Sequence, residues 1–230
     1  YMMAEAIEFS PVVAEWLGLW RARRVLTALT LGAVIFGITL STLHQSGLGA
    51  LFLLARSKIH PLWYTEFIPI LFLVSSIYAG LSMVIFEDGV SHRVFKSQVD
   101  PATREGILLG LGKGAAVTMF VYYFFKLLVF VHERQWALLP NPWGAWYLVE
   151  VLGLTLVPCF MFAHGVRNRR LGIIRAAAVL ALLGIVANRL NTSIIAFRWD
   201  APVHYYPSWM EIVVTLMVVF SEIWVFRWIV

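Results

Sequence analysis

The sequence predicts an all-α membrane protein, a polytopic helical bundle with about six transmembrane helices. Hydrophobic residues make up 60% of the 230 residues and charged residues only 13%, with a mean hydropathy of +0.80. These values lie outside the usual composition of soluble domains. Several apolar runs approach the roughly 20 residues that a helix needs to cross the hydrocarbon core, whereas the alternating segments of a membrane barrel are absent.

Hydropathy divides the chain into an N-terminal segment, residues 1–24, and a transmembrane helical domain, residues 25–230. The stretch 45–64 is predicted to be interfacial, because its apolar part is too short to cross a membrane. The chain opens at Tyr1 without a signal-peptide pattern, so we expect further sequence upstream. The predicted spans are 25–43, 67–86, 106–130, 144–164, 173–197 and 209–229.

Basic residues between the spans predict the orientation. Nine of them lie on the side of residues 1–24 and four on the opposite side, which places the N-terminus of this chain inside. The outside connections are rich in Pro, Trp and Tyr, as an interfacial belt is. The net charge of +5 does not indicate a nucleic-acid partner, because the basic residues do not form one stripe.

Cysteine and histidine usage argues against a metal cofactor in this chain. The only cysteine, Cys159, lies in an apolar run, so a cysteine-ligated iron-sulfur cluster lacks ligands. Haem needs facing histidines at matched depth, but His44 and His164 are predicted on opposite sides and the others fall in connections. We therefore expect no haem or iron-sulfur cluster here, and we find no nucleophile for covalent catalysis.

Polar residues in the outer parts of the predicted helices converge on one level. A charge in hydrocarbon costs at least about 2.5 kcal/mol, so each one needs a partner or a purpose. Asn188 and Asn191 share a helix face, and Arg189 points about 100° away; we expect Arg189 to pair with Glu150 or Glu211. The alternative is that these groups only hold the helices together.

This polar level suits a quinone, whose carbonyls accept hydrogen bonds and whose reduction consumes protons. Two alternatives stay open: a secondary transporter or ion channel, and a purely structural anchor. The candidate quinone-binding residues are His44, Gln45, Asn188, Arg189, Asn191, Tyr206 and Glu211, and the candidate proton-path residues are Glu87, Lys113, Lys126, Glu150, His164 and Glu222.

Four segments together resemble the HybB branch of the NrfD/PsrC family. They are "STLHQSGLGALFLLARSKIHPLWY" (41–64), "GLSMVIFE" (80–87), "NRLNTS" (188–193) and "HYYPSWMEI" (204–212). Members of this family have about ten crossings in two four-helix bundles with extra helices. By this resemblance, the first predicted span closes one bundle, the next four form the second, and the last is the final helix.

The resemblance also implies a role. The chain would be a multi-pass subunit of the bacterial cytoplasmic membrane, surrounded by lipid, which passes electrons between menaquinone and an extracytoplasmic iron-sulfur subunit. That partner would connect to a catalytic subunit on the outer face, such as a hydrogenase. Apart from the resemblance, protonatable residues at both depths suit a proton relay, so coupling to proton translocation is a further hypothesis. The resemblance assigns His44 to the quinone site and, less directly, residues of the last two spans.

Overall fold

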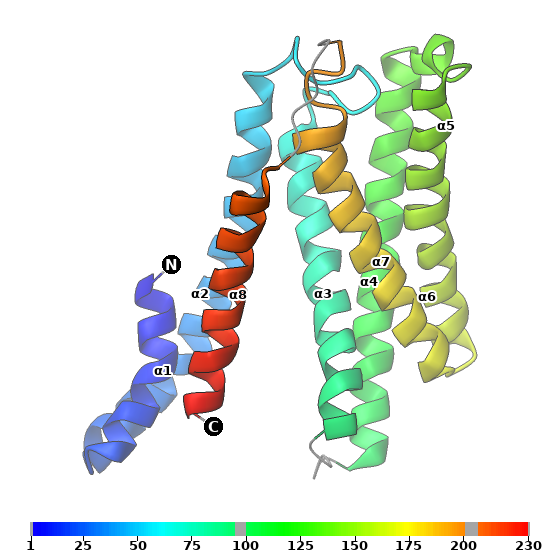
Figure 1. The fold of residues 1–230 in the computed structure, drawn as a ribbon. Helices are drawn as coiled ribbons and strands as arrows, with labels where there is room; N and C mark the ends of the chain where they lie inside the picture. The colour runs from blue at the N-terminus through cyan, green and yellow to red at the C-terminus, as the bar shows by residue number, and fades with distance from the viewer. Residues whose placement is uncertain (1, 95–99, 201–206, 230) are drawn as a thin grey trace.

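The computed structural model describes residues 2–94, 100–200 and 207–229, and they fold into a set of long helices (Figure 1). Five helices or continuous helical stretches in this part of the chain are long and apolar enough to cross a membrane, which confirms the all-α polytopic class. The elements are α1 (Met2–Trp16), α2 (Trp20–Leu53), α3 (Ile68–Val94), α4 (Pro101–His132), η1 (Gln135–Leu138), α5 (Pro142–Leu148), η2 (Val149–Leu156), α6 (Val157–Arg167), α7 (Leu171–Leu190), η3 (Asn191–Ile195) and α8 (Trp209–Ile229).

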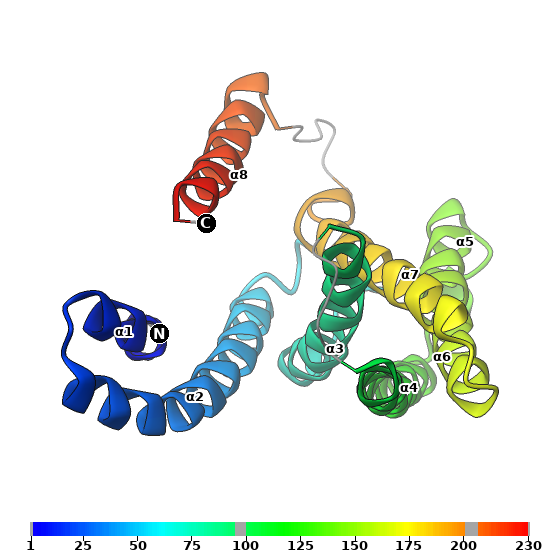
Figure 2. The same cartoon turned by 90° about the horizontal axis from the view of Figure 1, so that it is seen from below.

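Four transmembrane stretches pack into one bundle: α3, α4, the continuous stretch α5–η2–α6, and α7 with η3 (Figure 2). Its core is apolar and closely packed, with Met119, Phe162 and Ile174 fully buried. Small residues bring the helices together: a Cβ on Gly165 of α6 would lie 2.8 Å from Ile174 of α7. The second to fifth predicted spans therefore form a four-helix bundle, as the resemblance implied.

Helix α2 differs from its prediction. It runs unbroken from Trp20 to Leu53 and packs beside α3, so the first part of the predicted interfacial stretch 45–64 continues this helix. The physical reasons are that α2 contains no proline and that Gly49 packs on the next helix. Gly49 lies so close to α3 that a Cβ there would be 2.9 Å from the Cα of Pro69.

The N-terminal segment also has structure that the sequence reading did not give it. Helix α1 runs antiparallel to α2 and packs along it, and the turn between them contains Gly18, whose φ is +72° (Figure 1). Glycine tolerates this left-handed conformation without a Cβ clash. Residues 2–24 are thus largely helical, and the position of this segment inside the cell stays a prediction.

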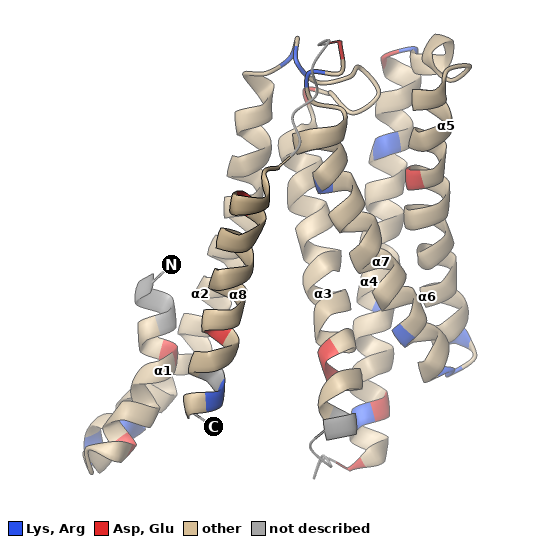
Figure 3. Ribbon diagram, in the orientation of Figure 1, with Lys and Arg blue, Asp and Glu red and all other residues tan. Residues whose placement is uncertain are grey.

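The connection from α2 to α3 and the connection from α4 to α5 meet at one end of the bundle, which we call the upper end (Figure 1). There α2, α4 and η3 end, and α3 and α5 begin. At the lower end Asp88 accepts from Arg104 at 2.7 Å and from Arg175 at 3.3 Å. Most charges lie near the two ends, and an opposite pair lies within the bundle on α4 and η2 (Figure 3).

Candidate functional site

Glu150, at the start of η2, is the centre of the buried polar site. Its side chain is 3% exposed. One carboxylate oxygen accepts from Trp63 Nε1 at 2.7 Å and from Asn191 Nδ2. The other accepts from Asn188 Nδ2 at 2.7 Å and from Lys126 Nζ at 3.4 Å. Four donors from three parts of the chain therefore converge on one carboxylate: the α2–α3 connection, α4, and α7 with η3. We call Glu150 and these four donors the Glu150 network.

Lys126 supplies the positive charge of the network. Its side chain is 9% exposed, and its Nζ lies 5.0 Å from the centre of the Tyr147 ring as well as 3.4 Å from Glu150. The predicted pair of Arg189 with Glu150 is wrong, because Lys126 takes that place. On α7, Asn188 faces Glu150, and Arg189 is turned away by one residue's rotation of about 100°.

Arg189 lies on the seam between α3 and α7. Its guanidinium carbon is 3.4 Å from the centre of the Phe72 ring, a cation–π contact. It donates to Ser75 Oγ at 2.7 Å and to Asn188 Oδ1 at 3.3 Å. Asn188 thus connects the Arg189 guanidinium to the Glu150 carboxylate.

Two π-helical turns place the acceptor and one donor opposite each other. Glu150 lies in η2 and Asn191 begins η3, and both segments are π-helices. A π-turn inserts an extra residue and rotates the following side chains, and such turns are frequent at functional sites. Trp146 Nε1 donates to Asn191 Oδ1 at 2.9 Å, so the Asn191 amide presents its nitrogen to Glu150. The two tryptophans of this site were missed by sequence reasoning, which assigned such residues to an interfacial belt.

The structure brings together only part of the predicted quinone-binding set. Asn188, Asn191 and Arg189 join the Glu150 network directly or through one contact. His44 is exposed and Gln45 half-buried on α2, and no hydrogen bond within the described residues joins either to the network. Glu211 forms a capping box at the start of α8: its Oε2 accepts from Ser208 N at 3.1 Å, and its N donates to Ser208 Oγ at 3.4 Å. Tyr206 lies outside the described residues.

The predicted proton-path residues separate into two groups. Lys126 and Glu150 form the buried pair. The other four have exposed side chains, on the outer surfaces of their helices rather than in the bundle core: Glu87, Lys113, His164 and Glu222. Hydropathy predicts depth along a helix, but it does not tell which way a side chain faces.

An aromatic cap covers the upper end of the site. His60 is 4% exposed, and its ring lies 4.8 Å from Trp199 and 5.3 Å from Trp143. Its backbone N donates to the carbonyl of Ala196 at 2.9 Å, which joins the α2–α3 connection to the end of η3. Trp63, three residues later, reaches down to Glu150, so the cap and the network are mechanically connected.

The cap is expected to loosen as the pH falls below about 6.5. Burial lowers the pKa of His60, and so the folded cap favours the neutral ring. Above the ordinary pKa both states are neutral; between the ordinary and the lowered pKa only the open cap takes a proton, which destabilises the closed cap. As the pH falls, the protection of the backbone amides in residues 58–64 against hydrogen exchange is expected to decrease. Protection here means the intrinsic exchange rate divided by the observed rate, and it falls by no more than about tenfold per pH unit. His60→Gln is the control, since it removes the titrating group; equal pH dependence in both proteins would contradict the assignment.

Comparisons with known proteins agree with this architecture. A family model described as "Polysulphide reductase, NrfD" matches residues 1–196. A protein of Nitratidesulfovibrio vulgaris is 46% identical over 234 residues, which cover 100% of this chain and 60% of that protein. The "Probable Ni/Fe-hydrogenase 2 b-type cytochrome subunit" of Escherichia coli is 27% identical over 224 residues, which cover 97% of this chain and 57% of that protein. The chain therefore spans about three fifths of the length of these relatives. No solved structure gives a significant match.

Proposed function

The chain belongs to the NrfD polysulphide reductase family, and on that basis we propose that it is part of the quinone-reactive membrane anchor of a respiratory oxidoreductase. It passes electrons between menaquinone and an extracytoplasmic iron-sulfur subunit, which connects it to a catalytic subunit. The similarity to the Escherichia coli protein supports a hydrogenase-like catalytic partner. In this proposal the chain lies in the bacterial cytoplasmic membrane with its N-terminal end inside, and it carries no haem or iron-sulfur cluster of its own.

The observation that carries the proposal is the link from Arg189 through Asn188 to the buried Glu150–Lys126 pair. Arg189 is half-buried and has five N–H donors, of which its contacts to Ser75 and Asn188 use only some. A quinone carbonyl accepts hydrogen bonds, so Arg189 is the group we assign to the quinone head. Because charges interact strongly in a medium of low dielectric constant, a charge that forms on the quinone is felt at the Glu150–Lys126 pair.

Proton uptake is the second part of the proposal. Reduction of a quinone by two electrons takes up two protons, and Glu150 and Lys126 are the buried groups that hold and exchange them. Translocation toward the lower end follows the bundle interior, where Tyr122, Tyr78 and Ser82 are 3% exposed or less. The Ser82 hydroxyl oxygen has no hydrogen-bond partner within the described residues, so it can form a hydrogen bond with a water that enters the bundle.

The test is quinone turnover by the complete complex in proteoliposomes. Arg189→Gln removes a charged donor worth about 1.5–3 kcal/mol, so menaquinone-analogue turnover is expected to fall roughly 10- to 100-fold. Dye-linked activity of the catalytic partner is expected to stay unchanged, and a potential-sensitive dye reports translocation in the same vesicles. Arg167→Gln, at an exposed site in the last turn of α6, is the matched control. If assembled Arg189→Gln complex turns over quinone at the normal rate, the assignment fails.

A further inference from the structure

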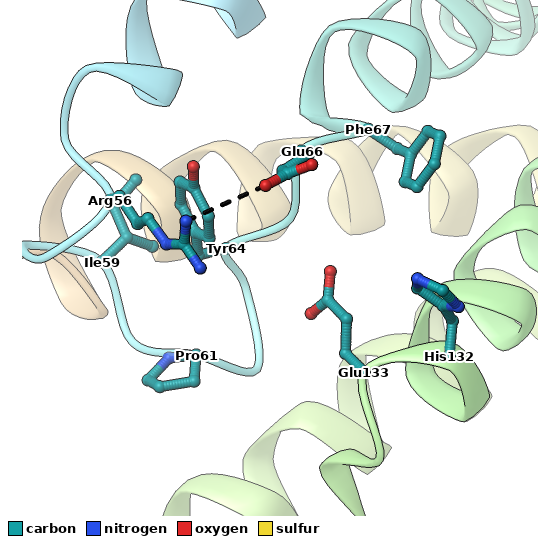
Figure 4. A pocket seen from close by; sticks show the side chains of 8 residues that line it. All are labelled: Arg56, Ile59, Pro61, Tyr64, Glu66, Phe67, His132 and Glu133. Carbon is teal, nitrogen blue, oxygen red and sulfur yellow. Dashed lines mark ion pairs between the residues drawn. The ribbon is translucent and has the colours of Figure 1, made fainter.

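A pocket opens at the upper end between the α2–α3 connection and the end of α4 (Figure 4). Its volume of ≈ 480 Å³ far exceeds the roughly 30 Å³ that a water takes up in the liquid, so it accepts a larger group. It is separate from the Glu150 network, because none of the network's residues lines it. The function proposed above leaves this pocket unused.

Two carboxylates give the pocket a negative character. Glu66, from the α2–α3 connection, and Glu133, at the end of α4, line it from opposite walls (Figure 4). Arg56 is the lining residue with a permanent positive charge, and it reaches Glu66 only at 3.9 Å, with the two side chains 76% and 75% exposed. Among the described residues Arg56 forms an ion pair with Glu66 alone, and Glu133, beside His132 in the lining, forms none, which favours a second cation between the two carboxylates.

Gln135 holds the two walls of the pocket in place. Its side-chain nitrogen donates to Glu133 Oε2 at 2.7 Å and to the carbonyl of Pro61 at 2.9 Å. Gln135 is 4% exposed, so this bridge is buried behind the pocket. The Glu133 carboxylate is therefore positioned before any partner arrives.

Aromatic side chains supply the rest of the lining. Tyr64 already carries a cation on its face, since the Arg56 guanidinium carbon lies 5.9 Å from the ring centre. Phe67, also in the lining, is 45% exposed. A long side chain with a cationic head packs its methylene stem on such rings and places its head among carboxylates. Lysine and arginine are the side chains with this shape.

We propose that this pocket receives a lysine or arginine side chain of the extracytoplasmic partner subunit and so fixes where that subunit docks. This inference rests on the proposed function in one respect, namely that the partner lies at the upper end. The charge pattern and the shape of the lining select the chemistry of the inserted group.

The first test maps what enters the pocket. The photoreactive residue p-benzoyl-phenylalanine replaces Phe67 in the complete complex, and crosslinked peptides are identified by mass spectrometry. A peptide of a co-purified extracytoplasmic subunit, with Lys or Arg within two or three residues of the crosslink, is expected. Crosslinks to lipid, to this protein's own chain, or to a partner peptide without a basic residue would overturn the inference.

The second test measures the strength of docking. The double variant Glu66→Gln/Glu133→Gln, in nanodiscs, is expected to bind the extracytoplasmic subunits about tenfold more weakly at low salt and to lose most of its salt dependence. Glu105→Gln is the matched control, because Glu105 is a partly exposed carboxylate, loosely paired with Arg169 at 4.0 Å, at the lower end. Unchanged affinity in the double variant overturns the inference. Neither test measures quinone turnover, so a failure of the electron-transfer proposal is seen separately.

Discussion

Replacement of Lys126 by Met is expected to lower the free energy of unfolding of the bundle by about 3–5 kcal/mol. The variant leaves the Glu150 carboxylate buried, with a side chain 3% exposed, and without its cation. Three neutral donors remain around it, from Trp63, Asn188 and Asn191. These hydrogen bonds stabilise the carboxylate but leave its negative charge uncompensated. An uncompensated buried charge is what makes the loss of one partner of a buried ion pair costly.

The double variant Lys126→Met/Glu150→Gln is expected to recover most of that loss. Glutamine removes the unpaired charge and keeps one acceptor oxygen, which can accept from two of the three remaining donors. Replacement of both members of a buried ion pair is often close to neutral, whereas removal of one member is not. Recovery in the double variant therefore separates the electrostatic cost from a general packing defect.

Cys159 provides the measurement. It is 6% exposed in the bundle core and is the only cysteine in the sequence, so a thiol-reactive fluorescent dye labels it when the bundle unfolds. Dye labelling is measured against temperature on the purified complex. The labelling of the Cys159→Ala variant, which comes from other cysteines of the complex, is subtracted as background. Lys113→Met is the matched control, because Lys113 is an exposed lysine of the same helix and its loss is expected to change stability by less than about 0.5 kcal/mol. Equal curves for Lys113→Met and Lys126→Met would show that the buried pair does not stabilise the bundle.

The fold was predictable because apolar run length reports membrane crossing directly. Every predicted span overlaps an observed helix or helical stretch, from α2 to α8. The end of α2 was not predictable in the same way, because two glycines and a polar pair suggest a break while the observed helix continues to Leu53. Tertiary packing of Gly49 on Pro69 favours continuation, and that contact is not visible in the sequence.

The sequence predicted at which level along the helices the site residues lie, but not which way each side chain faces. Lys126, Glu150, Asn188 and Asn191 were placed on one level by counting residues, and the structure joins them. The partner of Glu150 was misassigned because the sequence does not tell which face of α7 points toward η2: Asn188 donates to Glu150, whereas Arg189, about 100° away, contacts Ser75 on α3. Trp63 was missed because an indole that caps a carboxylate has the same sequence signature as one that lies at a membrane interface.

Gly184→Ala is expected to destabilise the bundle by about 1–3 kcal/mol, although alanine is the better helix former. Gly184 lies on α7 one turn before Asn188. A Cβ at this position would lie 2.5 Å from the carbonyl oxygen of Leu154 and 3.1 Å from its Cβ. Because the Leu154 oxygen belongs to the backbone of η2, it cannot rotate away, so α7 and η2 must separate.

That separation is also expected to weaken the site, since Asn188 and Asn191 on one side of this seam donate to Glu150 on the other. Gly110→Ala is the matched control: it lies on α4 with nothing within 4 Å of an added Cβ, so alanine is expected to leave stability unchanged or raise it by up to about 1 kcal/mol. The change in stability is therefore expected to be a decrease for Gly184→Ala and zero or an increase for Gly110→Ala, both measured by the same Cys159 labelling assay. If Gly184→Ala is as stable as Gly110→Ala and turns over quinone normally, α7 and η2 do not approach as closely as the network requires.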